Sequence, residues 1–411
     1  MKRIERVRLY PTAGQRRRLN FALDVTRQLF NALLQQRRDA WRMRRYSVST
    51  KEQYRELTAL RAEDARVAAV YRECQDAVLH RLDLAFAAFF RRIKQGETPG
   101  YPRFRGHLRW GQLEFPHGDR ALKFNAEQTK VKIPGIGLVS LRKGRRVPTF
   151  GRAWLVRRGT HWFACFECER DVAPLPRTGK SIGIDRGVHV LAATSEGWLI
   201  GNPRFLARAR LLIERFQRAV SRKRRGGKNR RKAVRLLARA YERIKEARRD
   251  FLHKAARKIV NASDAIVLEA LNLRSMTRSA KGTMETPGRN VRAKAGLNRA
   301  LLDSSFGLLR QMIVEKAVEA ARTVVEVDPR YSSQECARCA NVAAESRRER
   351  RYVCIGCGFR VHADVNAALV IRGRAELRPA ARGASLEDLT DPRSVPDAGA
   401  ELARCDQEVA A

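Results

Sequence analysis

Four cysteines in the last quarter of the chain have the spacing of a metal site. Cys336 and Cys339 form one Cys-x-x-Cys pair, Cys354 and Cys357 form a second, and 14 residues separate the pairs. Two such turns can place four thiolates around one tetrahedral Zn²⁺, with Zn–S distances of about 2.3 Å. Free core thiols or two disulfides are the alternatives, although nothing in the sequence indicates the export that disulfides require. We predict a structural zinc site, because protein ligands would fill all four positions.

Three carboxylates are candidates for a second, chemically different metal site. Asp185 and Glu269 each end an apolar, strand-like run, and Asp364 opens a helical run. Taken singly, each could be a helix cap or half of a salt bridge. Taken together, three clustered carboxylates would repel one another unless divalent cations neutralised them. Hard oxygen ligands favour Mg²⁺ or Mn²⁺, and two such ions about 3.5–4 Å apart can hydrolyse a phosphodiester.

Basic and aromatic residues form two candidate nucleic-acid contacts. The segment 204–258 contains 22 basic and 4 acidic residues, and its centre is expected to be the turn of a helical hairpin. The second segment, 100–105, alternates aromatic and cationic side chains, which can stack on bases and bind phosphates. A solvated helix face and a strand entering the core are the respective alternatives. The candidate residues are Arg222, Lys223, Arg224, Arg225 and Lys228 in the turn, and Tyr101, Arg103, Phe104 and Arg105 in the second segment.

The order of elements suggests how the chain would bring the carboxylates together. Hydrophobic periodicity predicts a helical block between residues 12 and 95, and strand-like runs follow it up to residue 168. We expect these runs and an N-terminal strand to form one β-rich domain, into which the helices are inserted. From residue 179 the order is three antiparallel strands, helix, strand, helix, strand, as in an RNase H-like sheet. In such a sheet the first and fourth strands are neighbours, which would place Asp185 beside Glu269.

The charge and length of the chain narrow the class of partner. The 411 residues include 85 Lys and Arg against 43 Asp and Glu, a formal net charge of +42. Such an excess fits nucleic acid better than an anionic membrane surface. No apolar run has the roughly 18 residues of a membrane span, and the N-terminus has no secretory signal. We therefore expect a cytoplasmic protein, with a disordered tail at residues 373–411, where acidic residues outnumber basic ones.

An ordered series of motifs resembles the TnpB family of insertion-sequence transposons, which is related to type V CRISPR effectors. The resemblance covers about residues 1–372. Ala340 departs from the family's usual Gly after the second knuckle cysteine, and Val370 departs from a common Asn; neither position is a metal ligand. The motifs are Arg-Leu-Tyr-Pro at 8–11, Ala-Phe-Ala-Ala-Phe-Phe at 85–90, Gly-Tyr-Pro-Arg-Phe-Arg at 100–105, Gly-Ile-Asp-Arg-Gly at 183–187, Val-Leu-Glu-Ala-Leu-Asn-Leu at 267–273, Ser-Ser-Gln-Glu-Cys at 332–336 and Asp-Val-Asn-Ala-Ala at 364–368.

The resemblance implies an RNA-guided DNA endonuclease in which Asp185, Glu269 and Asp364 form a RuvC-like site that cuts double-stranded DNA. Its cofactors would be Mg²⁺ (or Mn²⁺), Zn²⁺ and a guide RNA from the transposon end, and the protein would read a short motif beside the target. The expected fold class is α/β and multi-domain. Its parts are a β-barrel wedge domain (1–12 and 96–178), a helical recognition domain (13–95), a RuvC-like nuclease domain (179–335 and 358–372) and an inserted zinc ribbon (336–357).

Two other functions remain compatible with the same motifs. An RNA-guided DNA-binding repressor would bind without cutting, but such a protein is expected to have lost an acidic ligand, and all three are present. An accessory transposase would join DNA, for which the sequence has no distinct signature. We expect a monomer or a loose dimer that binds no membrane.

Overall fold

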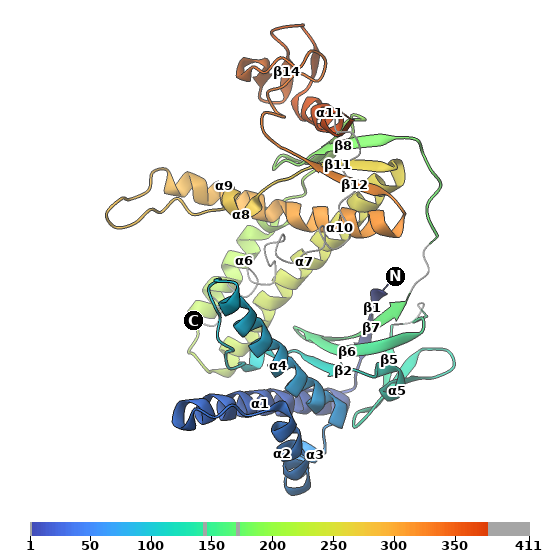
Figure 1. The fold of residues 1–411 in the computed structure, drawn as a ribbon, viewed down its shortest axis with the longest axis vertical. Helices are drawn as coiled ribbons and strands as arrows, with labels where there is room; N and C mark the ends of the chain where they lie inside the picture. Colours follow the sequence, from blue (N-terminus) through green and yellow to red (C-terminus); the bar gives the residue numbers. More distant parts are fainter. Residues whose placement is uncertain (1, 143–145, 170–172, 377–411) are drawn as a thin grey trace. The chain divides into compact units, whose positions relative to one another are not determined.

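The structure is a computed structural model that describes residues 2–142, 146–169 and 173–376. The chain divides into two compact units, residues 1–171 and 172–411, and each is described by itself (Figure 1). We expected the corresponding boundary near residue 178. The expected tail, 373–411, lies outside the described residues except for 373–376, which continue a helix.

The first unit contains a seven-stranded antiparallel sheet with the strand order β2-β6-β7-β1-β5-β4-β3. The N-terminal strand β1 pairs with β7 and with β5, so it completes the sheet as the sequence predicted. The β-barrel expected here is a half-barrel: the described strands form an open sheet, with β2 and β3 at its edges. These edge strands have four and two residues. The strands are β1 (Lys2–Tyr10), β2 (Gln112–Phe115), β3 (Lys123–Phe124), β4 (Lys130–Ile133), β5 (Gly137–Leu141), β6 (Phe150–Arg158) and β7 (His161–Glu169).

Helices of the first unit share one core with this sheet. Thr12 begins α1 with a capping box, in which its hydroxyl accepts from the Gln15 amide and the Gln15 side chain accepts from the Thr12 amide. The predicted stripe of α1 is buried, and the indole of Trp110 donates to the Thr26 hydroxyl over 2.9 Å. This hydrogen bond joins α1 to the loop that precedes β2 inside the core. The elements are α1 (Ala13–Arg44), α2 (Thr50–Glu63), α3 (Ala65–Ala68), α4 (Arg72–Lys94), a 3-10 turn η1 (His107–Arg109) and α5 (Gly118–Ala121).

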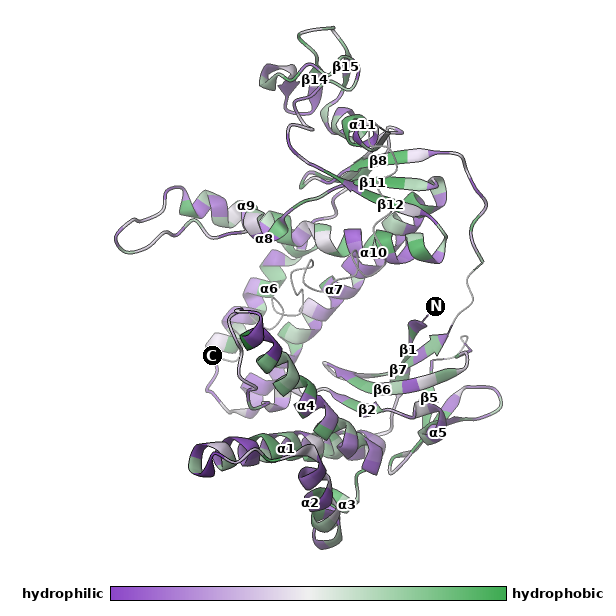
Figure 2. Cartoon of the chain, viewed as in Figure 1, coloured by the Kyte–Doolittle hydropathy of each residue, from purple (hydrophilic) through white to green (hydrophobic). Residues whose placement is uncertain are grey.

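The second unit is built on a five-stranded sheet with the order β10-β9-β8-β11-β12. The strands β8, β9 and β10 are antiparallel, whereas β11 runs parallel to both β8 and β12. The first and fourth strands are therefore neighbours, as the element order predicted. In Figure 2 the central strands are largely hydrophobic, as expected of strands covered on both faces. The strands are β8 (Ser181–Asp185), β9 (Val190–Thr194), β10 (Leu199–Gly201), β11 (Ala265–Glu269) and β12 (Thr323–Val327).

Helices cover both faces of the second sheet. Residues of α7 and α10 pack with β8 and β11 in one core, and α11 packs on the opposite face through Ile371, which contacts Val267 and Val327. Helices α6 and α7 also form a hairpin with a small core of its own. The helices are α6 (Phe205–Ser221), α7 (Lys228–Ala262), α8 (Leu273–Met276), α9 (Val291–Ser304), α10 (Phe306–Glu319) and α11 (Ala363–Glu376).

One predicted helix is divided in the structure. The element order placed one helix between the last two strands, but α9 ends at Ser304 and α10 begins at Phe306, because Ser305 has a left-handed backbone (φ 55°). The hydroxyls of Ser304 and Ser305 donate to the carbonyls of Ala300 and Leu302, which competes with continued helix formation.

A small three-stranded sheet lies between β12 and α11. It consists of β13 (Arg347–Arg348), β14 (Arg351–Val353) and β15 (Arg360–His362), preceded by a 3-10 turn η2 (Ala344–Ser346). We refer to residues 328–362 as the cysteine module. In the described part of the chain, no helix combines the length and the apolar character needed to cross a membrane.

Candidate metal centres and nucleic-acid interface

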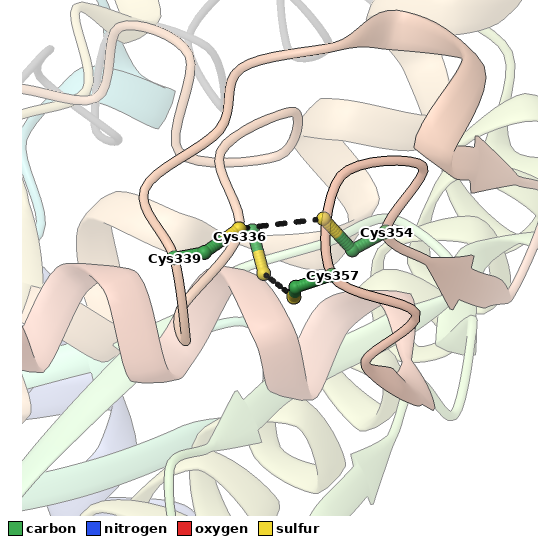
Figure 3. A group of neighbouring side chains, drawn as sticks. All are labelled: Cys336, Cys339, Cys354 and Cys357. Atoms are coloured by element: carbon green, nitrogen blue, oxygen red, sulfur yellow. Dashed lines mark hydrogen bonds between the residues drawn. The ribbon is translucent and has the colours of Figure 1, made fainter.

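The four predicted cysteines meet in the cysteine module. Their sulfur atoms all lie within 4.8 Å of one another, and Figure 3 shows the two pairs facing each other. The Sγ atoms of Cys336 and Cys357 are 3.7 Å apart, and those of Cys339 and Cys354 are 3.6 Å apart. Four thiolates at about 2.3 Å from one tetrahedral ion would be about 3.8 Å apart. The sulfur positions therefore fit a Zn²⁺ ion, and their spacing is too long for disulfide bonds.

The two Cys-x-x-Cys turns have closely similar backbones. In the first, the amide of Ala340 donates to the Cys336 carbonyl over 2.9 Å, and in the second the amide of Gly358 donates to the Cys354 carbonyl over 2.9 Å. Ala340 and Gly358 both have left-handed backbones, with φ of 57° and 70°. The amide of Arg338 also points at the Cys336 sulfur, 3.4 Å away. Such N–H donors stabilise thiolates, the form that binds metal.

Helix α11 holds the cysteine module through one buried amide. The Oδ1 atom of Asn366 accepts from the Ala337 amide over 3.1 Å, and its Nδ2 atom donates to the Glu335 carbonyl over 2.6 Å. Asn366 is fully buried, so both ends of its side chain are used in the interior. Arg374, further along the helix, forms an ion pair with Glu335. The first knuckle is therefore fixed to the same helix that carries Asp364.

Strand pairing and one glycine bring the three carboxylates to one region. Leu268 of β11 lies opposite Ile184 of β8, so the next residues, Glu269 and Asp185, end neighbouring parallel strands. Helix α11 crosses β8 in direct backbone contact: a Cβ atom on Gly183 would lie 2.1 Å from the Ala368 carbonyl oxygen. Only glycine permits this approach. The helix begins at Ala363, which places Asp364 in its first turn.

Asp185 interacts electrostatically with both of the other carboxylates. Burial, and then the charges of Glu269 and Asp364, raise the pKa of Asp185 from 3.8 to about 7, while Arg347 and Arg186 act in the opposite direction. Burial also raises the pKa of Glu269, despite a hydrogen bond to its carboxylate. Carboxylates in such surroundings favour a proton or a cation as partner. Carboxylate oxygens are also the ligands that a hard divalent ion such as Mg²⁺ prefers.

Two of the three acidic side chains, those of Glu269 and Asp364, also have a protein partner. The Ser332 hydroxyl donates to Glu269 Oε1 over 2.7 Å, and Arg347 of β13 donates to Asp364 Oδ1 over 2.8 Å. Among the described residues, ligand atoms mutually within 4.8 Å occur as a group in the four cysteines and not in the three carboxylates. A bound cation would therefore compete with Arg347 for Asp364.

The residues that support the carboxylates, Ser332, Arg347 and Arg186, were not predicted from the sequence. Arg347 lies in a linker rich in charged residues, where its type alone did not distinguish it. Ser332 belongs to the Ser-Ser-Gln-Glu-Cys motif at 332–336, but no role was predicted for it. The available signal was its position shortly before Cys336, the first cysteine of the first knuckle. The buried Arg186 follows Asp185 and donates to the Glu269 carbonyl, which ties the ends of β8 and β11 together.

Comparison with known proteins identifies the family. A family model described as OrfB_IS605, a probable transposase, matches residues 163–280, and a Cas12f1-like TNB domain model matches residues 306–371. InsQ of Escherichia coli (strain K12), provisionally named an RNA-guided DNA endonuclease, is 32% identical over 293 residues, which are 71% of each chain. The chain belongs to the TnpB family. The first model spans Asp185 and Glu269, and the second spans the four cysteines and Asp364.

Two further similarities extend over more of this TnpB-family chain. A Streptomyces pristinaespiralis relative, also provisionally named an RNA-guided DNA endonuclease, is 29% identical and covers 90% of this chain and 88% of its own. The solved structure of the mini-RNA-guided endonuclease CRISPR-Cas_phi3 has a TM-score of 0.50, with 9% identity over 92% of this chain and 93% of that one. At this identity the structural likeness concerns the fold alone.

A third family model describes residues 1–45 as a helix-turn-helix domain. In this TnpB-family chain the described residues of that segment form one strand and one helix, β1 and α1.

The aromatic–basic candidates lie at the end of α4. The ring of Tyr101 meets the rings of Phe86 and Phe89 edge-on, at centroid distances of 5.7 and 5.3 Å. Tyr101 and Phe104 remain 43% and 44% exposed, so neither enters the core as a strand residue would. The backbone of Arg105 forms two hydrogen bonds with the Asn31 side chain, and Arg103 is exposed.

The basic candidates of the second unit lie in the loop between α6 and α7 and at the first position of α7. Lys223 is half-buried and the other four are exposed, which are Arg222, Arg224, Arg225 and Lys228. The hairpin packs through Ile213, Val220 and Leu237, so its tip can present charge without disturbing a core. The predicted turn is confirmed, and the two nucleic-acid candidate groups belong to different units.

Proposed function

We propose that this protein is an RNA-guided DNA endonuclease of an insertion element, and that it hydrolyses DNA at a RuvC-like site formed by Asp185, Glu269 and Asp364. The observation that carries the proposal is the placement of Asp185 and Glu269 at the ends of the neighbouring strands β8 and β11 and of Asp364 in the first turn of α11, where the charges of Glu269 and Asp364 both act on Asp185. Membership of a family whose named relatives are endonucleases supports the same reaction.

The three carboxylates would hold Mg²⁺ or Mn²⁺, which when bound supplies an activated water and neutralises charge at the scissile phosphodiester. The protein's own contribution is positioning. Ser332 holds one oxygen of Glu269, and Arg186 fixes the backbone at the same residue. The ionisation of Asp185 depends strongly on a nearby cation, because the pKa of this carboxyl is raised to about 7.

The four cysteines would hold one Zn²⁺ ion with a structural role. Cys336, Cys339, Cys354 and Cys357 would fill all four tetrahedral positions and leave none open to a substrate. Through Asn366 the zinc-bound knuckle would support the start of α11 and hence Asp364.

Guide RNA and double-stranded target DNA are the proposed partners. The net charge of +42 supports a polyanionic partner of considerable length. We assign the sheet of the first unit as a wedge domain that holds RNA, with 13–95 as its recognition helices. The exposed rings of Tyr101 and Phe104 would stack on unpaired bases, Arg103 and Arg105 would bind phosphates, and the basic tip of the α6–α7 hairpin would contact the nucleic-acid backbone.

A cleavage assay tests the proposal. The protein is purified from cells that also carry its native flanking DNA, and the co-purifying RNA is sequenced. Plasmids that match the 3′ end of this RNA, beside randomised flanks, are then supplied with Mg²⁺. We expect double-strand cuts that require RNA, metal and Asp185, and we expect Asp185→Ala to retain RNA-dependent DNA binding. Binding without cutting by the wild-type protein would instead indicate a targeting protein, and the nuclease assignment would be wrong.

A further inference from the structure

Two loops of the second unit lie at the same edge of the sheet as the carboxylates. One follows β8 and contains residues 186–189, and the other follows β10 and contains residues 202–204. Because β8 and β9 are antiparallel and β9 and β10 are antiparallel, β8 and β10 end at one edge. Glu269 ends β11 at this edge too, since β11 is parallel to β8. Both loops therefore flank the strand ends that carry the acidic residues.

A single asparagine ties these loops together. The Nδ2 atom of Asn202 donates to the Val188 carbonyl over 2.7 Å and to the Ser304 hydroxyl over 2.9 Å, while its Oδ1 atom accepts from the Arg204 amide over 3.0 Å. Arg204 has a left-handed backbone, with φ 49° and ψ 53°. A non-glycine residue adopts this conformation only where the surrounding structure enforces it. The surrounding structure therefore fixes the backbone conformation of Arg204.

The side chain of Arg204 has an unusual partner. Its Nη2 atom lies 3.0 Å from Nδ1 of His189, and both residues are exposed. A guanidinium can only donate, so Nδ1 is the acceptor in this contact, and the tautomer that accepts there has its ring N–H at Nε2. Nearby Arg210 and Arg248 pair instead with the carboxylates of Glu214 and Asp303. The pair of Arg204 and His189 consequently combines a cation with a second N–H donor.

A backbone phosphate would satisfy these donors. The three carboxylates at this edge repel a polyanion, so a strand held beside them needs fixed positive donors as well as bound cations. Guanidinium groups bind phosphate through several N–H groups at once, and an imidazole Nε2–H adds one more donor. The helix N-terminus that follows Arg204 is not the source of this affinity, because Asp303 already accepts from the amides of Leu206 and Ala207.

We infer that His189 and Arg204 form a phosphate subsite that binds the DNA strand at a nucleotide flanking the cut. The inference rests on the proposed nuclease function and extends it to residues outside the carboxylate group. It assigns His189 and Arg204 a positioning role: they hold the strand in register with Asp185 and do not take part in bond cleavage.

The first test compares variants of Arg204 under single-turnover conditions. Arg204→Gly removes the side chain and suits the left-handed backbone, so the loop should keep its conformation. Arg204→Lys retains the charge, and Arg208→Ala removes an exposed charge one helical turn away. The targets carry one uncharged methylphosphonate at successive positions near the cut. We expect one position at which the wild-type rate falls about tenfold, the effect of one charge-assisted hydrogen bond. Arg204→Gly should be slower on the normal target and insensitive at that position.

A second measurement does not depend on cleavage. Histidine rings are labelled with ¹³C in the full-length protein, and the resonance of His189, one of seven histidines, is assigned with His189→Gln. A dithymidine phosphodiester should shift this resonance in the wild type and leave it unchanged in Arg204→Gly. No shift in the wild type, or equal methylphosphonate sensitivity in Arg204→Gly and Arg208→Ala, would overturn the subsite. Failure of the wild type to cut any target would refute the nuclease function instead, and the resonance would still decide the subsite.

Discussion

The two cysteine knuckles permit a matched exchange of alanine and glycine. Ala340 and Gly358 occupy equivalent positions, each donating its amide to the carbonyl of the first cysteine of its turn. Both backbones are left-handed, yet only one position has the residue suited to that conformation. Ala340→Gly should therefore strengthen the cysteine module, and Gly358→Ala should weaken it.

The magnitude follows from backbone strain and chain entropy. A left-handed backbone costs a non-glycine residue about 1–2 kcal/mol, whereas glycine adds about 0.4–1 kcal/mol of entropy to the unfolded chain. The net benefit of Ala340→Gly is then about 0.5–1 kcal/mol. A Cβ atom on Gly358 would have no heavy atom within 4 Å, so Gly358→Ala should cost a similar amount through backbone strain alone. If zinc binds with folding of the module, as we propose, these energies correspond to roughly two- to fivefold changes in Zn²⁺ affinity.

Competition with a chromophoric zinc chelator measures this affinity in the full-length protein. The expected order of Zn²⁺ affinity is Ala340→Gly above wild type and wild type above Gly358→Ala. Weaker zinc binding by Ala340→Gly would refute the reasoning, since it would mean that the alanine methyl group contributes more than its backbone strain costs. An unchanged affinity in Gly358→Ala would show that the left-handed turn is not under strain.

Three further predictions concern the carboxylates and their supports. Burial beside Glu269 and Asp364 raises the pKa of Asp185 from 3.8 to about 7, so metal-free folded protein loses stability as pH rises through this range. In Mg²⁺-free buffer, Asp185→Asn should stabilise the second unit, and calorimetry should show the gain growing by up to about 2 kcal/mol between pH 5.5 and 8; a constant gain would contradict the assigned pKa. Ser332→Ala should lower the cleavage rate about tenfold through lost positioning of Glu269, and an equal rate would exclude that role. Asn366→Ala should speed zinc release to a chelator, because it frees two backbone groups of the first knuckle; unchanged release would mean that the knuckle needs no support from α11.

The carboxylate and cysteine groups could be predicted because their signals are local. Each Cys-x-x-Cys turn defines half of a site by itself, and the apolar runs ending in Asp185 and Glu269 define their strands. The order of these elements then placed the two strands side by side, as the pairing of Ile184 with Leu268 confirms.

The remaining features depend on tertiary contacts that residue type does not encode. Arg347 is one of many arginines in its segment, and only the three-stranded sheet brings it to Asp364. The hydrophobic periodicity of the sequence continues across Ser305, because the apolar stripe of α9 and α10 is compatible with one helix as well as two. The pattern therefore does not show where α9 ends. The open edges of the first sheet depend on which strands pair, and residue type does not encode that pairing.

The first turn of α11 joins the two metal centres. Asp364 belongs to the carboxylate group, and Asn366, two residues later, holds the backbone of the first knuckle. Arg347 forms a second link between the cysteine module and the carboxylate group, since it belongs to the module and donates to the Asp364 carboxylate. A zinc ion with no open coordination position would thus influence the proposed hydrolysis, because folding of the module positions both the start of α11 and the Arg347 guanidinium that contacts Asp364. Bringing Arg347 to this site makes the cysteine module part of the carboxylate centre's electrostatics and not only a separate support.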